Sequence, residues 1–231
     1  MPGNCTITVK NNMKVVGFIH AKGNSERVSN KNLKLLNGKP LFTYAIEIAQ
    51  HANCIDEVVI DSDSDEILRL GEKLGATPLK RPKKLASNKT TGDDLAFWQA
   101  SNYSDSDFIV QVVPTSPFLK SLTIDNAFKT LSKSNYDSIV AVHEEFFYFW
   151  NKGKPDYFNS DGSIPNSNTL KSAVFETTGL YMSRTNYVLS EKKRMNPENS
   201  LPIFVSKLES VDINYPEDFE FAEILMRGIS A

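Results

Sequence analysis

Short apolar runs alternate with helical patterns along most of this 231-residue chain. Near-continuous apolar strands separated by helices are typical of an α/β fold with a parallel or mostly parallel sheet covered on both faces. The predicted strands are 14–20, 57–60, 76–79, 108–113 and 138–142. The predicted helices are 40–52, 64–74, 92–100, 121–134 and 216–227. In such sheets, ligands bind beyond the carboxyl ends of the strands, where the loops gather.

The predicted helix ends rest on residues that commonly begin or end helices. Pro40 and Pro216 suit the first helical turn, and the Ser- and Asp-rich stretch 62–65 offers caps for the second helix. Gly228 is expected to close the last helix.

Composition excludes several classes of function. The formal net charge is −2, so the chain as a whole does not favour a nucleic acid polymer. No apolar run is long enough to span a bilayer, so no membrane partner is expected. The two cysteines, Cys5 and Cys54, show no metal-ligand spacing, and a reducing, cytoplasmic location is predicted.

Residues 143–175 interrupt the alternation of strands and helices. Five aromatic residues, 146–150, precede a passage rich in Gly, Pro, Asn and Ser. One interpretation is a long surface excursion held by core aromatics. The other is an arm that buries these aromatics against a second subunit.

A basic loop follows the first apolar run. Lys22, Arg27 and Lys31 lie there among small residues, after the apolar residues 15–19. Backbone N–H groups and cationic side chains in such a loop can surround a polyphosphate. The loop has neither the dinucleotide nor the P-loop glycine pattern. A solvated surface turn is the alternative interpretation.

Two further segments offer polar groups where loops are expected. Residues 81–92 lead into a helix, and their N–H groups can meet a base edge or a phosphate, although Thr91 can equally be a simple helix cap. Thr115 and Ser116 stand between Pro114 and Pro117 directly after a strand, where the prolines stop the ladder and the hydroxyls are exposed. An ordinary turn also explains that pattern.

The last segment is Val-Asp-Ile-Asn-Tyr-Pro at 211–216. With period-two alternation, Asp212 and Asn214 point to one side and Ile213 points into the core. Two oxygen ligands on one face suit Mg²⁺, which completes its octahedron with phosphate and water. The alternative is that both are turn-formers before a helix.

In this order, the segments resemble the acylneuraminate cytidylyltransferase family, the CMP-sugar synthetases of nine-carbon and related acids. Its opening pattern is matched by Ala-Lys-Gly-Asn-Ser at 21–25 and Lys-Asn-Leu at 31–33. Its Arg-Pro-x-x-Leu-Ala-Ser motif is matched at 81–87, and its Pro-Thr-Ser-Pro motif at 114–117. Its closing Val-Asp-Ile-Asp-x-Pro-Glu-Asp motif is matched at 211–218, and its Asn-Gly-Ala-Ile-Tyr strand only loosely at 178–182.

The resemblance implies a CTP-dependent nucleotidyltransferase that transfers CMP to the anomeric hydroxyl of a 2-keto-3-deoxy, sialic-acid-like sugar acid and releases pyrophosphate. It implies a single domain, 1–231, with a Rossmann-like sheet and Mg²⁺ as cofactor. It also implies a homodimer joined by an inserted arm, 143–175.

The resemblance also implies roles by position. The triphosphate would be bound by Ala21, Lys22, Ser25, Lys31 and Asn32. The cytosine and ribose would be lined by Arg81, Thr91 and Gly92. The acceptor would contact Thr115, Ser116, Glu176 and Thr178. The metal would be held by Asp212 with Asn214. Because phosphoryl transfer is mostly positioning and charge stabilisation, Lys22, Lys31 and Asp212 are the predicted catalytic residues.

Four positions depart from the family pattern, and two of them, Val113 and Glu176, leave the acceptor open. Lys22 replaces an arginine, which exchanges a bidentate fork for a point charge. Val113 replaces a glutamine that could contact substrate, and Glu176 occupies a neighbourhood where a basic residue is usual. Asn214 replaces a second aspartate. Two alternatives therefore stand: a nucleotidyltransferase of the same fold with another acceptor, and a non-catalytic nucleotide-binding protein.

Overall fold

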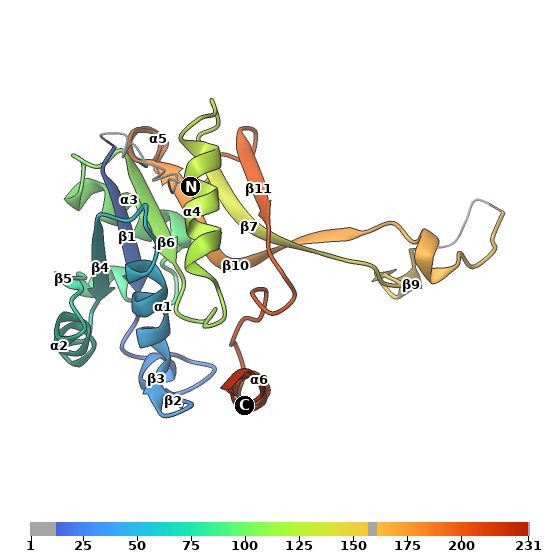
Figure 1. The fold of residues 1–231 in the computed structure, drawn as a ribbon, viewed down its shortest axis with the longest axis horizontal. Coiled ribbons are helices and arrows are strands. Elements are labelled where there is room, and N and C mark those ends of the chain that lie inside the picture. The colour runs from blue at the N-terminus through green and yellow to red at the C-terminus, as the bar shows by residue number, and fades with distance from the viewer. Residues whose placement is uncertain (1–12, 157–160, 231) are drawn as a thin grey trace, which may run out of the picture.

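A computed structural model describes residues 13–156 and 161–230 and is built around one seven-stranded sheet of order β11-β7-β10-β6-β1-β4-β5 (Figure 1). The strands of this sheet are β1 (Val15–His20), β4 (Glu57–Ser62), β5 (Thr77–Lys80), β6 (Phe108–Val112), β7 (Ser138–Glu145), β10 (Ala173–Arg184) and β11 (Ser200–Phe204). Only β10 runs antiparallel to its neighbours β6 and β7, and the other pairs are parallel. The mostly parallel α/β sheet is therefore confirmed.

Helices follow most of the strands. They are α1 (Leu41–Gln50), α2 (Asp65–Lys73), α3 (Gly92–Asn102), α4 (Ser121–Leu131), α5 (Thr185–Glu191) and α6 (Pro216–Ser230). Three short 3₁₀ helices cover Lys31–Leu33, Lys83–Leu85 and Ser167–Thr169. Two small hairpins pair β2 (Leu35–Leu36) with β3 (Lys39–Pro40) and β8 (Trp150–Asn151) with β9 (Lys154–Pro155).

Helices cover both faces of the sheet because side chains alternate along each strand. On β1, Val15 and Ile19 pack in a core with α1, α2 and α4. Val16 and Phe18 point the other way and pack in a second core with α3 and α5. Such two-sided burial explains why the strands are apolar along nearly their whole length.

The helix ends agree with the sequence at two positions and differ at two. Ser64 caps α2, its side chain accepting from the Ile67 amide, and Pro216 is the first residue of α6. Pro40 is the residue before α1 rather than part of its first turn. The prediction that Gly228 closes the last helix was wrong, because α6 continues to Ser230.

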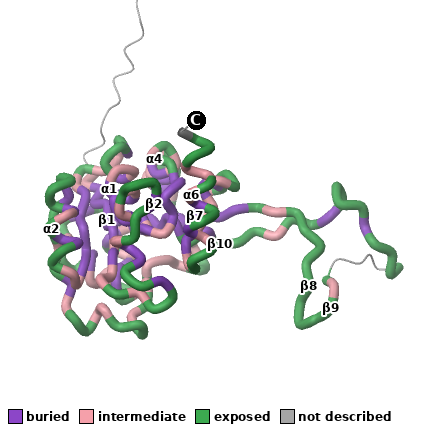
Figure 2. The backbone as a smooth tube through the Cα atoms, turned by 90° about the horizontal axis from the view of Figure 1, so that it is seen from below, coloured by how far each residue is buried: buried purple, intermediate pink, exposed green. Residues whose placement is uncertain are grey.

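The segment between β7 and β10 projects from the body of the molecule (Figures 1 and 2). The ends of β7 and β10 pair as a two-stranded ribbon, from Ala173 opposite Glu145 to Glu176 opposite Val142. All five aromatics at 146–150 are exposed, with Phe146 and Trp150 the most exposed at 58% and 59%. They are not core residues, so the interpretation of core-anchored aromatics was wrong.

The carboxyl ends of the parallel strands gather loops at one edge of the sheet. Because β10 is antiparallel, its middle reaches the same edge, where the Val113 amide donates to the Gly179 carbonyl at 3.0 Å. The register between β10 and β7 breaks between Glu176 and Tyr181, and Thr178 adopts a positive φ of 60°. This irregularity brings Gly179 against Ser116, in the loop that follows β6, and Thr178 against Asp212.

The structure bears on the cysteines and on membrane-spanning segments only within the residues it describes. Cys54 carries a free thiol, while Cys5 lies outside the described residues. In the part of the chain that the structure describes, none of the helices combines the length and apolar character needed to cross a bilayer.

Candidate active site

Lys31 and Asp212, 181 positions apart in the sequence, meet at the carboxyl edge. The Lys31 ammonium donates to the Ile213 carbonyl at 2.8 Å, which places it beside the backbone of Asp212. Asp212 Oδ2 accepts from Thr178 Oγ1 at 3.2 Å and from the side-chain NH₂ of Asn214. Asp212 Oδ1 is buried and has no hydrogen-bond partner among the described residues. The site therefore holds a cation, a carboxylate and an open carboxylate oxygen together.

The Asp212 segment is anchored to the loop after β6. The Ile213 amide donates to the Thr115 carbonyl at 2.9 Å, and the Ile213 side chain is fully buried. Asp218, in the first turn of α6, accepts from the Asn214 and Tyr215 amides at 2.7 Å. The expected alternation, with Ile213 in the core, is confirmed, and the carboxylate is held on a rigid support.

Lys31 lies deep in the site for a lysine. Its residue is only 9% exposed. Burial lowers the pKa of its ammonium from the usual 10.5, and the nearby Asp212 carboxylate opposes that change. An ammonium has three N–H donors and Ile213 uses one. The remaining donors can meet an anionic ligand from this largely buried position, where little water competes.

The basic loop and the 81–92 segment lie side by side. The Lys22 ammonium donates to Asn88, and the Asn88 amide donates to Glu26. Asn32 is buried and donates to the Lys22 carbonyl at 2.8 Å. Ala21, also buried, is held by its amide on the Asp61 carbonyl at 3.0 Å. Ser25, in the same loop, is partly buried.

Thr91 and Gly92 form the beginning of α3. Thr91 is the N-cap, and its hydroxyl and Asp94 form a reciprocal capping box, so the cap interpretation of Thr91 is confirmed. Gly92 lies against Arg194, and a Cβ built at Gly92 would be 2.7 Å from the guanidinium carbon. The glycine thus leaves room for an arginine from the α5–β11 connection.

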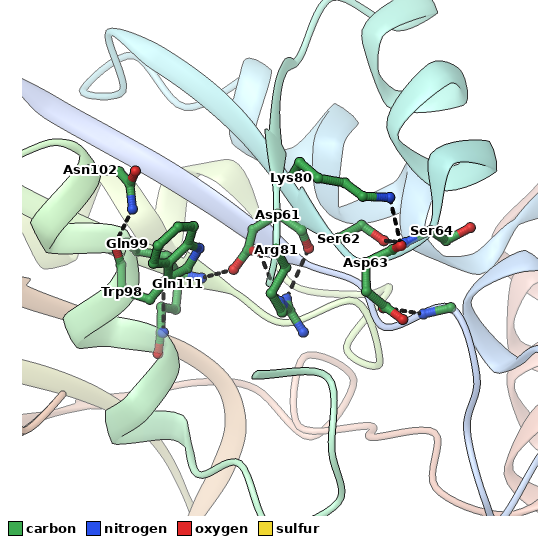
Figure 3. Close-up of polar contacts among 11 residues, drawn as sticks. Asp61, Ser62, Asp63, Ser64, Lys80, Arg81, Trp98, Gln99, Asn102 and Gln111 are labelled. Atoms are coloured by element: carbon green, nitrogen blue, oxygen red, sulfur yellow. Dashed lines mark hydrogen bonds and ion pairs between the residues drawn. The ribbon is translucent and has the colours of Figure 1, made fainter. Parts of the chain in front are cut away.

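Arg81 is buried in a polar chain that the sequence did not predict (Figure 3). Its Nε donates to Asp61 Oδ1 at 2.8 Å, and its Nη2 donates to the Asp61 carbonyl at 2.9 Å. Asp61 Oδ2 accepts from Gln99 at 2.8 Å, and Gln99 Oε1 accepts from Gln111 at 2.8 Å. The four side chains are at most 3% exposed.

The acceptor-only carboxylate of Asp61 fixes the direction of this chain. Gln99 must turn its NH₂ toward Asp61, so its carbonyl oxygen faces Gln111. Gln111 then turns its own NH₂ toward Gln99, and its Oε1 is left buried with no partner in the described part of the chain. A buried unpaired acceptor is costly, which marks this oxygen as a contact point for a ligand or an ordered water.

The predicted acceptor residues surround β10. Ser116 Oγ is buried with no partner among the residues described, and lies against Gly179. Thr178 bonds Asp212, as above. Glu176 is exposed and accepts from the Tyr181 hydroxyl at 2.8 Å. Thr178 therefore contacts Asp212 directly and Ser116 lies beside the adjacent Gly179, while Glu176 is joined to Tyr181.

His20 ends β1 on the same face as the Asp61–Arg81 pair. Its Nδ1 is buried without a partner in the described structure. Burial first, and then the positive charges of Arg81 and Arg194, lower its pKa to about 3. The imidazole is therefore neutral at pH 7, and it lies within the field of two guanidinium groups.

Sequence reasoning missed Asp61, Gln99, Gln111 and Arg194. Gln111 had a signal, since it is a polar residue inside the apolar run 108–113. Asp61 had a weaker one, as the first polar residue after the run 57–60. Arg194 had none, because its partners Gly92 and Tyr181 come from distant segments.

Metal-binding capacity rests on Asp212. Among residues 13–156 and 161–230, no group of three or more His, Cys, Asp or Glu side chains is arranged to hold a metal ion. The unpaired Asp212 Oδ1 nevertheless offers one oxygen ligand. Mg²⁺ requires few protein ligands when substrate phosphates and water supply the rest, so the residues present fit that ion.

Comparison with known proteins gives consistent matches over nearly the whole chain. Residues 16–225 match the sequence profile of a family described as cytidylyltransferase. A CMP-N,N'-diacetyllegionaminic acid synthase from Legionella pneumophila is 30% identical over 93% of this chain and 97% of its own length. An N-acylneuraminate cytidylyltransferase from Escherichia coli is 28% identical over 90% of this chain, which spans about half of that protein, 51%.

A solved structure shares the fold. A CMP:2-keto-3-deoxy-manno-octonic acid synthetase complexed with CTP superposes with a TM-score of 0.72, covering 94% of this chain and 99% of its own. The two sequences are 14% identical. At that identity the likeness is one of fold, and it agrees with the predicted Rossmann-like architecture.

Proposed function

Because the chain belongs to the cytidylyltransferase family, we propose that it transfers CMP from CTP to the anomeric hydroxyl of a 2-keto-3-deoxy sugar acid and releases pyrophosphate. The single observation that carries the proposal is that the Lys31 ammonium, bonded to the Ile213 carbonyl, lies close enough to the Asp212 carboxylate to feel its charge, while Asp212 Oδ1 is unpaired among the described residues. A cation and a carboxylate with an open oxygen are what a metal-bound triphosphate needs. The names of the relatives, which include synthases of two different CMP-sugar acids, support this reaction class.

Lys22 and Lys31 neutralise the charge of the triphosphate in this proposal. Negative charge grows on the pyrophosphate as it leaves, and a fixed cation stabilises it without reorganising. Lys31 is suited to this because the Ile213 carbonyl holds its ammonium in place. Ala21, Ser25 and Asn32 complete the phosphate side, with Asn32 holding the loop backbone at Lys22.

Asp212 would hold Mg²⁺ through its open Oδ1, with Asn214 beside it. When bound, the ion screens the phosphate oxygens and makes the attacking hydroxyl more acidic. The chain's own contribution is to keep the carboxylate in position: Thr178 and Asn214 donate to Oδ2, which leaves Oδ1 for the ion. Asn214 replaces a possible second carboxylate, so the site carries one negative charge fewer.

The nucleoside is proposed to lie between the 81–92 segment and the polar chain of Asp61. Gly92 begins α3 next to the Thr91 cap, whose own amide donates to Asp94, and Arg81 fixes the Asp61 carboxylate. Thr115, Ser116, Glu176 and Thr178 are left for the acceptor. The unpaired Ser116 hydroxyl is suited to bonding a sugar hydroxyl.

The ribbon and the exposed aromatics at 146–150 are proposed to join two copies of the chain. Five consecutive exposed aromatics are more apolar surface than an isolated loop usually presents. Trp150→Ser should shift a dimer toward monomer in sedimentation at micromolar concentration. Phe221→Ser, at an equally exposed aromatic on α6, is the matched control. A wild-type protein that is strictly monomeric in this sedimentation experiment contradicts this part of the proposal.

The test of the reaction is pyrophosphate release with CTP, Mg²⁺ and a panel of 2-keto-3-deoxy sugar acids, with the product identified by mass. Asp212→Asn should reduce turnover by about 100-fold or more, because it removes the charge that holds the ion. Asp105→Asn makes the same charge change on an exposed residue paired with Lys14 and should keep normal turnover. A CMP adduct on an unexpected acceptor would support the same-fold alternative. CTP-induced stabilisation without pyrophosphate from any acid would support a non-catalytic role.

A further inference from the structure

Arg194 occupies a central position in the site and has no role in the scheme above. It lies on the connection between α5 and β11. Its guanidinium carbon is 3.7 Å from the centroid of the Tyr181 ring, on β10. On another side the group lies against Gly92, at the beginning of α3. It therefore bridges the proposed nucleoside side and the β10 side of the site.

The backbone of Arg194 is fixed independently of its side chain. Its amide donates to Asp93 Oδ1 at 2.9 Å, and its carbonyl accepts from the Ser183 hydroxyl. Both contacts remain when the side chain is replaced. The guanidinium itself makes no hydrogen bond or ion pair among the described residues, although it is partly buried. Stacking on an aromatic ring leaves the N–H groups at the edge of the guanidinium plane free to donate.

A partly buried cation with free donors in this position is suited to an anion. The planar fork of arginine matches the two oxygens of a carboxylate in a bidentate pair. The β10 side otherwise offers Glu176, which is negative, and the hydroxyls of Thr178 and Ser116. An acidic acceptor bound there needs a positive partner, and Lys22 and Lys31 lie at the phosphate loop.

We propose that Arg194 binds the carboxylate of the sugar acid and selects acidic over neutral acceptors. The inference rests on the proposed function. In this proposal, the acidic Glu176 on β10 does not bind the acid. The positive charge that recognises the acid comes instead from Arg194, on the α5–β11 connection. Gly92 takes part indirectly, because a larger residue would displace the guanidinium.

Arg194→Met tests this assignment by keeping an unbranched stem and removing the donors. The KM for the acid should rise about 10- to 100-fold, the effect of losing a hydrogen bond between charged groups. The KM for CTP should change less than about threefold. Arg194→Lys, which keeps the charge without the fork, should recover part of the loss. Lys193→Met removes the same charge from the exposed neighbouring residue and should change neither KM.

A substrate comparison separates acceptor binding from a general defect. With the methyl ester of the same acid, Arg194→Met and wild type should have nearly equal KM values, because the ester offers no carboxylate. An equal loss with acid and ester would overturn the assignment. A raised KM for CTP alone would place Arg194 on the nucleotide and overturn it as well. A wild type that is inert with every acid overturns the proposed function itself, whereas an active wild type with a normal Arg194→Met variant overturns only this inference.

Discussion

Replacing Asp61 with Asn should destabilise the protein strongly, because Arg81 would lose its counter-charge in the interior. Arg81 is 3% exposed and Asp61 is fully buried. Removing one member of a buried ion pair typically costs about 3–5 kcal/mol of folding free energy. For a domain of this size, that corresponds to a fall in melting temperature of about 6–20 °C.

The hydrogen bonds of Gln99 and Gln111 should survive the Asp61→Asn substitution. In Asp61→Asn, the new NH₂ faces Gln99, so Gln99 and Gln111 must both turn over to keep their hydrogen bonds. Gln111 then leaves an NH₂ unpaired where the wild type leaves an oxygen. One unpaired buried group replaces another, so the change in stability comes mainly from the unbalanced guanidinium.

Urea and thermal unfolding, followed by the fluorescence of the two tryptophans, measure the effect. Asp65→Asn is the matched control, since Asp65 pairs with Lys80, next to Arg81, but is exposed and should unfold like wild type. The double variant Asp61→Asn/Arg81→Met should lose less free energy of unfolding than the two single variants lose in sum. An Asp61→Asn protein within about 1 kcal/mol of wild type, or strictly additive losses, would refute the buried-pair argument.

Other perturbations test separate parts of the site. Lys31→Met should raise the KM for CTP and reduce turnover by about 100-fold or more, and an unchanged CTP dependence in steady-state assays would remove Lys31 from the triphosphate. Gly92→Ala should push Arg194 from Tyr181 and raise the KM for the acid; equal KM values in the two proteins would contradict the packing. Native His20 has a pKa of about 3 against 6.5 in the unfolded chain, so only the unfolded state gains its proton as pH falls below about 6. Stability should therefore fall by up to about 1.4 kcal/mol per pH unit between pH 6 and 4, and His20→Gln should flatten that slope in thermal scans; identical slopes would contradict it.

The fold was largely predictable because each strand buries both faces. The apolar run at β1 and the alternation with helices fixed the parallel part of the sheet. The apolar pattern did not predict the antiparallel strand β10, which only the family resemblance indicated, loosely, at 178–182, because its first half is exposed on the ribbon and its second half is buried. Such a strand carries neither a continuous apolar run nor a clean alternation. The prediction also missed β11, whose residues are half-exposed at the edge of the sheet.

The site was predictable only where a short motif carried its own geometry. The 211–216 segment did so, because alternation alone placed Ile213 inside and Asp212 and Asn214 on the other side. The burial of Arg81 was not predictable, since it depends on Asp61 and Gln99, which lie on other elements. The position of Arg194 depends on the absence of a side chain at Gly92. The sequence shows the glycine but does not indicate which distant residue packs against it.

Thr178 lies where the pairing of β10 changes. On one side of this position, β10 has β7 as its only sheet neighbour along the ribbon, as far as Glu176; on the other, from Tyr181 onward, it is held by both β6 and β7. Residues 177–180 therefore join a two-stranded ribbon to a wider sheet, at the point where the register of β10 against β7 shifts. Thr178 lies within this junction and holds the Asp212 carboxylate. A partner bound to the ribbon would therefore act on the Asp212 carboxylate through its Oδ2 contact with Thr178, which leaves Oδ1 unpaired.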